Sequence, residues 1–494
     1  MTPIRPAWLR PRPPGPVTAP PSAIGAAPGR LPVLGHAIPL LRRPLEFIAS
    51  LPAHGDLVEV RLGPRRAFMV CRPELVQQVL LDPRTFDKGG PLFEAARLLV
   101  GNGLVTSGWA EHRIQRRLVQ PAFHPSRMAS YVGVMCEEID AALAAWEADR
   151  AFDLNAALHA LTIRVTMRTL FSTTIGSRAV AEVQHCLPVI LSGIYRRMIA
   201  PIGVLHSLPT PGNRQFDQAR ARLRTVIDET VQARRSAGSD TEDLLSILMG
   251  AQDEESGRRF TDDEIRDQVM TLLIGGTETT ASTLAWACHL LARHPEAEQE
   301  LQAEVDHVLG GRLLPAFHDL PALDHTRRVV TEALRLYPPA WILTRTATVE
   351  TELAGKPLAP GTIVLFSPYV LGRDPRVFTD PERFDPDRWL PGSVSSTQRG
   401  AMVPFSAGSR KCIGDSFGMA EATLALAAVS ARWRLRPVPG TAIRPKPKAA
   451  LNTGPLVMLP QQRTRPAHPA SCPGRRDRHD DPGVGPASLR GPCV

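Results

Sequence analysis

Apolar residues recur at intervals of three and four positions through much of the chain. This spacing places apolar side chains along one face of an α-helix, which can then pack against a core. Two stretches rich in Val, Leu, Ile and Phe, residues 56–71 and 361–370, instead suggest short strands. The pattern therefore predicts a mostly α fold with a small β region. The clearest predicted helices cover residues 135–148, 214–235, 263–294 and 296–311.

The two ends of the chain differ from this body. Residues 1–30 are rich in Pro and Arg, and residues 461–494 are rich in Pro, Gly, Arg and His. Such composition predicts a disordered lead over 1–30, a folded catalytic domain over 31–460 and a disordered tail over 461–494. Prolines also disfavour a helical anchor near the N-terminus. We therefore expect a cytoplasmic protein without an integral membrane anchor.

Charge and cysteine content narrow the function. Most of the formal net charge of +9 lies in the two ends, so the body carries no basic footprint for nucleic acid. The 7 cysteines are scattered without CxxC spacing, which argues against a disulfide framework or a zinc site. Cys412 is different, because it lies between a glycine-punctuated turn and an apolar helical run, beside Arg410 and Lys411. Helix amides and cations stabilise a thiolate there, and a thiolate can bind a metal.

The segment FSAGSRKCIG, residues 405–414, resembles the haem-binding loop of cytochromes P450 at every position. The resemblance implies the cytochrome P450 fold, with haem between a long distal helix and the proximal cysteine loop. It also implies haem b and O2 as cofactors, with Cys412 as the axial iron ligand. An ordinary buried cysteine after a turn is the alternative for an isolated Cys. The implied roles are that Phe405 covers the sulfur, Gly408 permits the bulge, Arg410 meets a propionate and Gly414 lets the helix approach the porphyrin.

A second motif, LLIGGTETTAS, lies within the longest predicted helix. Gly275 and Gly276 each cost about 1 kcal/mol in a helix interior, so their presence needs a reason. In the resembling family, glycines here make room for dioxygen, and an acid–alcohol pair relays protons. The resemblance gives those catalytic roles to Glu278 and Thr279. A kink in a core helix is the alternative.

In TEALRLYPPAW, Glu332 and Arg335 are three residues apart and can pair on a helix. By resemblance they join Arg383 of DPERFDPDRW in a buried network that supports the haem loop. A surface ion pair is the alternative. Where many relatives carry His before Arg-Asp-Pro, this chain has Gly372, which weakens that local correspondence.

Three further residues resemble the family's propionate ligands. His112 and Arg116 lie four apart on one predicted helix face, and Arg345 follows in WILTRTA. The resemblance implies that they bind the haem propionates together with Arg410. His112 could equally be an ordinary surface histidine.

The resemblance implies a monooxygenase that inserts oxygen from O2 into an apolar substrate. Wider stretches are similar to bacterial P450s that oxidise cyclic sesquiterpenes, such as pentalenene oxygenase and albaflavenone synthase. We therefore expect stepwise oxidation of a sesquiterpene hydrocarbon in terpenoid antibiotic biosynthesis, with a fatty acid, steroid or polyketide as alternative substrates. Five apolar residues are expected to line the substrate pocket, with ordinary core packing as the alternative for each: Phe93, Leu98, Ile274, Trp341 and Leu343.

No flavin or reductase segment is recognisable in the sequence. Electrons from NAD(P)H are therefore expected to arrive through a ferredoxin and a ferredoxin reductase. A basic proximal face that includes Arg117 and Lys411 would suit an acidic ferredoxin, although a solvated charge run is the alternative.

Two functions of other classes are also open. Asp262, Asp263 and Asp267 resemble the aspartate-rich magnesium motif of terpene cyclases. However, Thr261 followed by Glu264 also predicts a capping box, with acids in the first helical turn. A haem-binding sensor or carrier is the second alternative, and it would have no use for an acid–alcohol pair.

Overall fold

The computed structural model describes residues 23–63, 65–172, 176–199, 208–237, 243–440 and 442–464. Most of the predicted disordered lead, 1–30, and tail, 461–494, therefore lies outside the described residues. Part of the lead is ordered, because residues 24–26 form a strand that pairs with residues 57–59. At the other end, residues 461 and 462 close a strand. The folded body therefore extends beyond both predicted boundaries.

The described chain is mostly helical, as the sequence predicted. The α-helices are α1 (Ala37–Arg42), α2 (Pro44–Ser50), α3 (Pro73–Leu81), α4 (Pro91–Val100), α5 (Trp109–Val119), α6 (Pro125–Ala144), α7 (Leu154–Phe171), α8 (Ser177–Ile199), α9 (Pro211–Ala237), α10 (Leu244–Gly250), α11 (Asp262–Leu291), α12 (Pro295–Leu309), α13 (Asp324–Leu336), α14 (Pro368–Leu371), α15 (Ser396–Ala401) and α16 (Asp415–Arg432). Short 3-10 helices are η2 (Leu51–His54), η3 (Gln120–Phe123), η6 (Phe317–Asp319), η7 (Pro386–Trp389) and η8 (Gly408–Arg410).

Local signals set the ends of these helices. α11 begins with a capping box, in which Thr261 and Glu264 each accept a hydrogen bond from the backbone N–H of the other. Pro295 occupies the first position of α12, where its missing N–H costs nothing. Gly310 ends α12 in the left-handed conformation that glycine adopts without strain.

The strands form small sheets. They are β1 (Ile24–Ala26), β2 (Leu57–Leu62), β3 (Arg65–Val70), β4 (Phe86–Asp87), β5 (Phe152–Asp153), β6 (Leu343–Ala347), β7 (Thr351–Leu353), β8 (Lys356–Leu358), β9 (Ile363–Phe366), β10 (Trp433–Pro437), β11 (Lys446–Pro447), β12 (Leu451–Asn452) and β13 (Val457–Gln462). The largest sheet has the order β1-β2-β3-β9-β6-β4, so the predicted strand regions pair with each other through β3 and β9. The remaining sheets are β10-β13-β5, β11-β12 and β7-β8.

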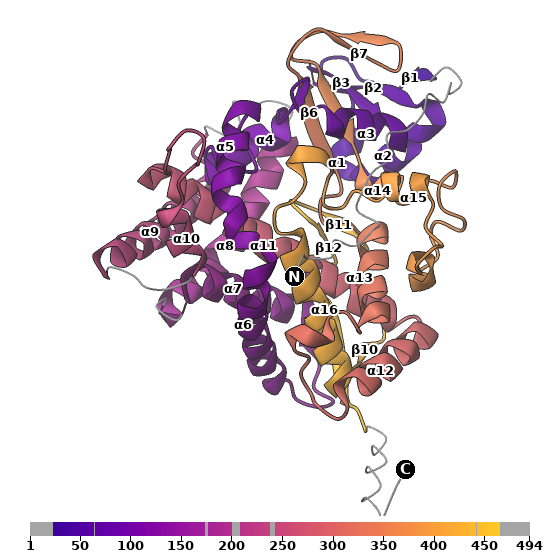
Figure 1. Cartoon of the computed structure of the whole chain (residues 1–494). Coiled ribbons are helices and arrows are strands. Elements are labelled where there is room, and N and C mark those ends of the chain that lie inside the picture. The colour runs from indigo at the N-terminus through magenta and orange to yellow at the C-terminus, as the bar shows by residue number, and fades with distance from the viewer. Residues whose placement is uncertain are drawn as a thin grey trace, which may run out of the picture. The chain divides into compact units, whose positions relative to one another are not determined.

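Helices α7 and α11 pack side by side and join two hydrophobic clusters. One cluster continues into α6, α12, α13 and α16, and the other into α4, α8, α9 and α10. In Figure 1 the strands β1, β2, β3 and β6 lie at the top, while α6, α7 and α12 lie in the lower part. The packed pair α7 and α11 therefore lies at the centre of the helical core.

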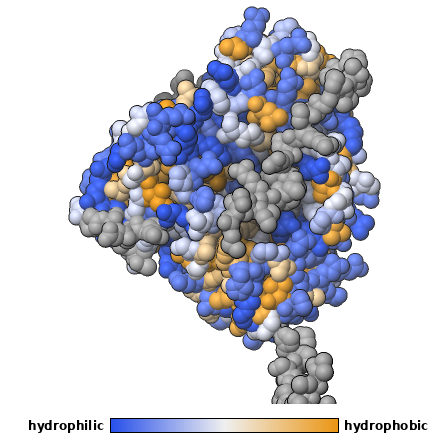
Figure 2. Space-filling model, in the orientation of Figure 1, coloured by the Kyte–Doolittle hydropathy of each residue, from blue (hydrophilic) through white to orange (hydrophobic). Residues whose placement is uncertain are grey.

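The face of the molecule drawn in Figure 2 is mostly hydrophilic, with hydrophobic residues in small separate groups. This distribution matches a protein whose large apolar side chains are mainly in the core. Within the described ranges, no helix is both long enough and apolar enough to cross a membrane.

Candidate active site

A cavity of about 370 Å³ lies among α5, α7, α11, α16, strand β6 and the loop before α16. Its volume falls within the range of roughly 300–1,000 Å³ that is typical of small-molecule sites. Segments from distant parts of the chain therefore meet at one place. Most of the predicted site residues line it: Cys412, Phe405, Arg410, Gly414, His112, Arg116, Arg345, Gly275, Gly276, Thr279 and Leu343.

The loop before α16 presents Cys412 to this cavity. The Cys412 backbone N–H donates to the Phe405 carbonyl at 2.9 Å, which closes the loop. Gly408 has a φ of 66°, and a Cβ there would lie 2.7 Å from the Leu80 carbonyl oxygen. Only glycine combines this conformation with so close an approach. Gly414 is the N-cap of α16, so the thiol lies at the N-terminal end of that helix.

Among the described cysteines, Cys412 differs in its accessibility. Cys71, Cys186 and Cys288 are buried and Cys136 is half-buried, whereas Cys412 is exposed. Burial raises the pKa of Cys71 and of Cys288 to about 12, so these thiols stay protonated. Desolvation by the surrounding protein also raises the pKa of the Cys412 thiol, but a helix N–H and neighbouring cations oppose that effect. Cys412 is therefore the described cysteine best placed to act as a ligand.

Positively charged side chains gather on the cavity wall. Arg345 is 1% exposed, and desolvation together with the charge of Arg410 lowers its pKa to about 10. Desolvation and the same two cations place the pKa of Lys88 well below its ordinary value. Desolvation and the charge of Arg410 also lower the pKa of His112 to about 3. Asp87 contacts Arg410 and neutralises only part of this charge. A ligand with carboxylates would suit the cluster.

Three buried nitrogen atoms in this cluster have no hydrogen-bond partner in the described part of the chain: His112 Nδ1, Arg345 Nη2 and Arg410 Nε. An unsatisfied buried polar group costs roughly 1–3 kcal/mol, so a bound anion would stabilise the site. Arg116, by contrast, donates to the Lys411 carbonyl at 2.6 Å and ties α5 to the cysteine loop.

Among the ionisable residues, Lys88 at the cavity and the buried Glu421 outside the described lining were not predicted from the sequence. Lys88 lines the cavity, and its ammonium lies 4.6 Å from the centre of the Phe93 ring. Glu421 on α16 is fully buried, and burial raises its pKa to about 8, so it is largely protonated at neutral pH. Glu421 is the one acid within the apolar run MAEATLALAAVSARW, and this pattern could have predicted a buried carboxyl. No local sequence pattern predicted a role for Lys88, because it meets the other cations only in the folded protein.

Helix α11 stays helical through both glycines. A Cβ on Gly275 would meet nothing within 4 Å, so this glycine leaves space beside the cavity. A Cβ on Gly276 would lie 2.9 Å from Thr166 Oγ1 on α7, so this glycine lets the two helices approach. Thr279, one turn after Gly275, donates its hydroxyl to the Gly275 carbonyl at 2.7 Å. Glycine is therefore needed at 275 to leave space beside the cavity, and at 276 to let α7 and α11 approach each other.

Glu278 lies outside the described cavity lining. Its carboxylate is 2.9 Å from Nε2 of His159 on α7, and His159 Nδ1 is 2.7 Å from the Asn155 carbonyl. Both ring nitrogens face acceptors, which favours the protonated imidazole. Burial lowers the pKa of His159, but its contacts with Glu278 outweigh burial and raise the pKa above 6.5. The predicted acid–alcohol pair is therefore divided, with Thr279 at the cavity and Glu278 held by α7.

The predicted pair of Glu332 and Arg335 is fully buried, with both side chains 0% exposed and Arg335 Nη2 2.7 Å from Glu332 Oε1. Arg335 also donates to the Gly372 and Pro381 carbonyls, each at 2.6 Å. Trp389 Nε1 donates to Glu332 at 2.8 Å. A Cβ on Gly372 would collide with the Arg335 carbonyl, which explains glycine there. The pair thus ties α13 to the segment that leads to the cysteine loop.

Arg383 differs from the sequence prediction. Its side chain is exposed, and only its backbone carbonyl accepts a hydrogen bond from Arg335, at 3.0 Å. The further guanidinium at Glu332 belongs to Arg388, whose Nε lies 3.4 Å from Oε1. The neighbouring Phe384 packs into the core, while Arg383 is exposed.

Four of the five predicted pocket residues are absent from the described cavity lining, and Leu343 is present. Leu98 is 47% exposed, and Phe93 packs beneath Lys88. Trp341 is buried in another cluster and donates to the Lys448 carbonyl. Ile274 is rotated by about 100° from Gly275 around the helix, so it faces away. The apolar lining instead includes Leu104, Val105, Leu170, Leu244 and Leu272.

The aspartates that resembled a magnesium motif have separate partners. Asp262 contacts Arg235, and Asp263 contacts Arg266. Asp267 accepts the Asn102 backbone N–H at 2.8 Å. No metal-binding group of described residues includes any of the three aspartates. These aspartates therefore form ion pairs and a hydrogen bond near the N-terminus of α11. The described residues offer no magnesium site for the cyclase alternative.

Arg117 and Lys411 were expected to contribute to a basic face. Arg117 Nε lies 2.6 Å from Asp253 Oδ1, and Lys411 contacts Asp415. Each charge is therefore balanced by an acid, so these two residues alone do not form a basic docking surface.

Comparison with known proteins adds to this geometry. Residues 26–464 match the family model described as cytochrome P450. The chain belongs to the cytochrome P450 family. It is 57% identical over 438 residues to cyclooctatin synthase of Streptomyces melanosporofaciens, covering 88% of this chain and 95% of the relative. It is 52% identical over 457 residues to cyclooctat-9-en-7-ol 5-monooxygenase of the same organism, covering 91% and 99%. Pentalenene oxygenase of Streptomyces avermitilis is 45% identical over 421 residues, covering 85% and 93%.

Membership makes this P450 a haem-thiolate oxidoreductase that uses O2. The residues of the cavity fit that cofactor. An accessible thiol faces the cavity from the loop before α16, and glycine opens the wall formed by α11. The two propionates of haem would supply the anionic partners that the unpaired nitrogens of His112, Arg345 and Arg410 lack.

Proposed function

We propose that this P450 oxidises a cyclic terpene and that Cys412 would supply the thiolate that holds the haem iron. The observation that carries the proposal is that the accessible Cys412 thiol and Thr279 line the same largely apolar cavity. His112, Arg345 and Arg410 would hold the propionates. When bound, haem supplies the activation of dioxygen and the insertion of one oxygen atom into an apolar substrate.

The protein's own part is to hold and move protons. The Thr279 hydroxyl donates to the Gly275 carbonyl, which leaves its oxygen lone pairs able to accept a proton at the cavity. Glu278 and His159 are both partly exposed, with side-chain exposures of 14% and 21%. The pair can therefore exchange protons with solvent, and Glu278 directly precedes Thr279 on α11. Such general acid catalysis contributes typically 10²–10⁴-fold.

The substrate is inferred from the cavity and from the names of the relatives. The leucines and valine of the lining favour a ligand without charge, because an unpaired buried charge is costly. One relative is named for pentalenene and two for the cyclooctat series. We therefore widen the expected sesquiterpene to a cyclic terpene hydrocarbon or its alcohol, oxidised in the biosynthesis of a terpenoid secondary metabolite. Fatty acids, steroids and polyketides are the competing substrates.

Titration of the haem-replete protein tests this substrate class. We expect pentalenene or cyclooctat-9-en-7-ol to displace iron-bound water and shift the Soret band from low to high spin. A long-chain fatty acid and a steroid should bind at least tenfold more weakly. Leu272→Phe, which fills the lining, should weaken terpene binding by about tenfold, or 1.4 kcal/mol. Leu98→Phe is the matched control, because Leu98 is exposed and outside the described lining. Tight fatty acid or steroid binding with silent terpenes would contradict the proposal.

Thr279→Ala distinguishes an enzyme from a haem-binding sensor or carrier. The variant should keep its haem and its thiolate-type carbon monoxide spectrum. Thr279 is not one of the residues proposed to hold the haem, and its hydroxyl donates only to a carbonyl within α11. Product formation should fall by about 10²-fold, since the proton-relaying hydroxyl is lost. Thr279→Ser restores the hydroxyl and should recover most of the turnover. Unchanged turnover in Thr279→Ala would argue for another proton route. Absence of turnover in the parent protein as well as in both variants would favour a haem-binding sensor or carrier.

The electron supply completes the proposal. P450s that resemble this chain generally depend on redox partners. We propose a ferredoxin and an NAD(P)H-dependent ferredoxin reductase. Since Arg117 and Lys411 are neutralised by acids, the docking surface would need other cations.

A further inference from the structure

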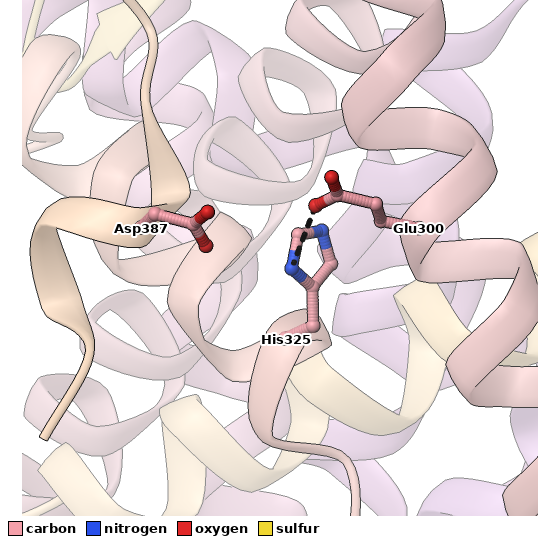
Figure 3. A group of neighbouring side chains, drawn as sticks. All are labelled: Glu300, His325 and Asp387. Carbon is pink, nitrogen blue, oxygen red and sulfur yellow. Dashed lines mark ion pairs between the residues drawn. The ribbon is translucent and has the colours of Figure 1, made fainter.

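Three side chains outside the cavity bring a nitrogen and two carboxylates together. His325 comes from the start of α13, Glu300 from α12 and Asp387 from η7. One potential ligand atom from each lies within 4.8 Å of the others. Figure 3 shows the carboxylates of Asp387 and Glu300 on two sides of the His325 ring. No other group of described residues meets this criterion.

The orientation of the His325 ring is set by its surroundings. The residue is 6% exposed, and its Nε2 lies 3.3 Å from the Ala297 carbonyl. Because a carbonyl oxygen can only accept, Nε2 must carry a proton. Nδ1 faces Glu300 and makes no hydrogen bond within the described ranges. Nδ1 of this ring thus points toward the Glu300 carboxylate, where a cation placed between them would be bound by both. A backbone carbonyl on the far nitrogen is the usual support of a metal-binding histidine.

The spacing also fits shared ligands better than an ion pair. His325 Nδ1 and Glu300 Oε2 are 3.6 Å apart, as the dashed line in Figure 3 marks. A charge-assisted N–H···O bond is about 2.7–2.9 Å long. Two ligands at about 2.0–2.1 Å from a tetrahedral zinc ion lie roughly 3.4 Å apart. Since Glu300 and Asp387 are exposed, small rotations can bring both carboxylates to that spacing.

The neighbouring charges leave the group negative. Arg328 contacts Asp387 Oδ1, but its Nε also lies 3.0 Å from Asp324 Oδ2. Asp324 also contacts Arg327, so two guanidiniums lie near the group. The four carboxylates outnumber them, because Glu304 adds a further negative charge where it accepts the His325 backbone N–H at 2.6 Å. Arg328 also orients the Asp387 carboxylate, as outer partners of ligating carboxylates do.

We propose that Glu300, His325 and Asp387 bind a divalent cation of the zinc type, with water completing the coordination. One imidazole and two carboxylates are ligands that suit Zn²⁺. The ion would join α12 to α13 and η7. Because η7 also supplies Arg388 and Trp389 to Glu332, the ion would brace the segment that precedes the cysteine loop. This role is independent of the terpene oxidation proposed above.

The test is a zinc titration of the full-length, haem-replete protein against a chromogenic zinc chelator near neutral pH. We expect Glu300→Gln and Asp387→Asn, which keep the side-chain shape, each to weaken zinc binding at least tenfold. Glu352→Gln is the control, because this exposed carboxylate lies on β7 outside the group, and it should bind zinc as the parent protein does. Each variant should keep the thiolate-type carbon monoxide band, which shows that fold and haem site are intact.

Equal zinc affinity in the parent protein and both ligand variants would overturn the proposal, since the zinc would then be bound elsewhere. Absence of measurable zinc binding would overturn it as well. Anomalous diffraction at the zinc edge gives an independent readout, with a peak expected between the three side chains. Loss of the carbon monoxide band in the parent protein would instead count against the proposed function.

Discussion

Cys412→Ala protein will show no thiolate-type Soret band when it is reduced and exposed to carbon monoxide. The band requires a thiolate on the iron, and Cys412 is the described cysteine whose sulfur is accessible and lines the cavity. Alanine fits the loop, because the loop closes through the Cys412 backbone N–H and not through its side chain. The loss should therefore be complete without unfolding, as judged by circular dichroism.

Cys288→Ala and Cys71→Ala are the matched controls for this result. Both thiols are buried, and burial raises the pKa of each to about 12, so neither can supply a thiolate at neutral pH. Both variants should keep the full thiolate band. If the band survived in Cys412→Ala and disappeared in a control, the assignment of the axial ligand would be wrong.

The features that the sequence predicted well are those set by neighbouring residues. The capping box at Thr261 and Glu264 depends on four consecutive positions, and it is present. The cysteine loop is similarly local, since Gly408, Cys412 and Phe405 are held by one turn and one backbone hydrogen bond. Helical spacing also placed Glu332 and Arg335 together. In each case the chemistry follows from spacing along one element.

The predictions that failed depended on which way a side chain points in the assembled core. Arg383 and Arg388 lie five positions apart in the same motif, and the assembled core, with Phe384 packed into it, brings Arg388 and not Arg383 to Glu332. Ile274 adjoins a cavity glycine in sequence, but one step around a helix turns it away. Lys88 reaches the other cations only because β4 pairs with β6, which brings residue 87 beside residue 346. Contacts that depend on pairing between distant strands cannot be predicted from the residues next to them in the sequence.

Glu332→Ala will destabilise the protein by about 3–5 kcal/mol, the range for breaking one side of a buried ion pair. Glu332 and Arg335 are both 0% exposed, so removal of the carboxylate leaves a guanidinium without a counter-charge in the core. The Asp385 backbone N–H and Trp389 Nε1 lose their acceptor at the same time. The measurement is urea unfolding of the haem-replete protein, followed by circular dichroism and by the Soret band.

Two comparison variants separate charge from other losses. Glu332→Gln keeps an acceptor for Trp389 but removes the charge, so a midpoint between those of the parent and Glu332→Ala would assign part of the effect to the hydrogen bonds. Glu147→Ala breaks an exposed pair with Arg150, whose side chains are 64% and 72% exposed, and should leave the unfolding midpoint unchanged. If Glu332→Ala unfolded at the parent's midpoint, the buried pair would not be what holds α13 to the segment before the cysteine loop. In Glu332→Ala the Soret band is expected to decay together with the helical signal, because the segment held by Glu332 positions the loop that carries Cys412.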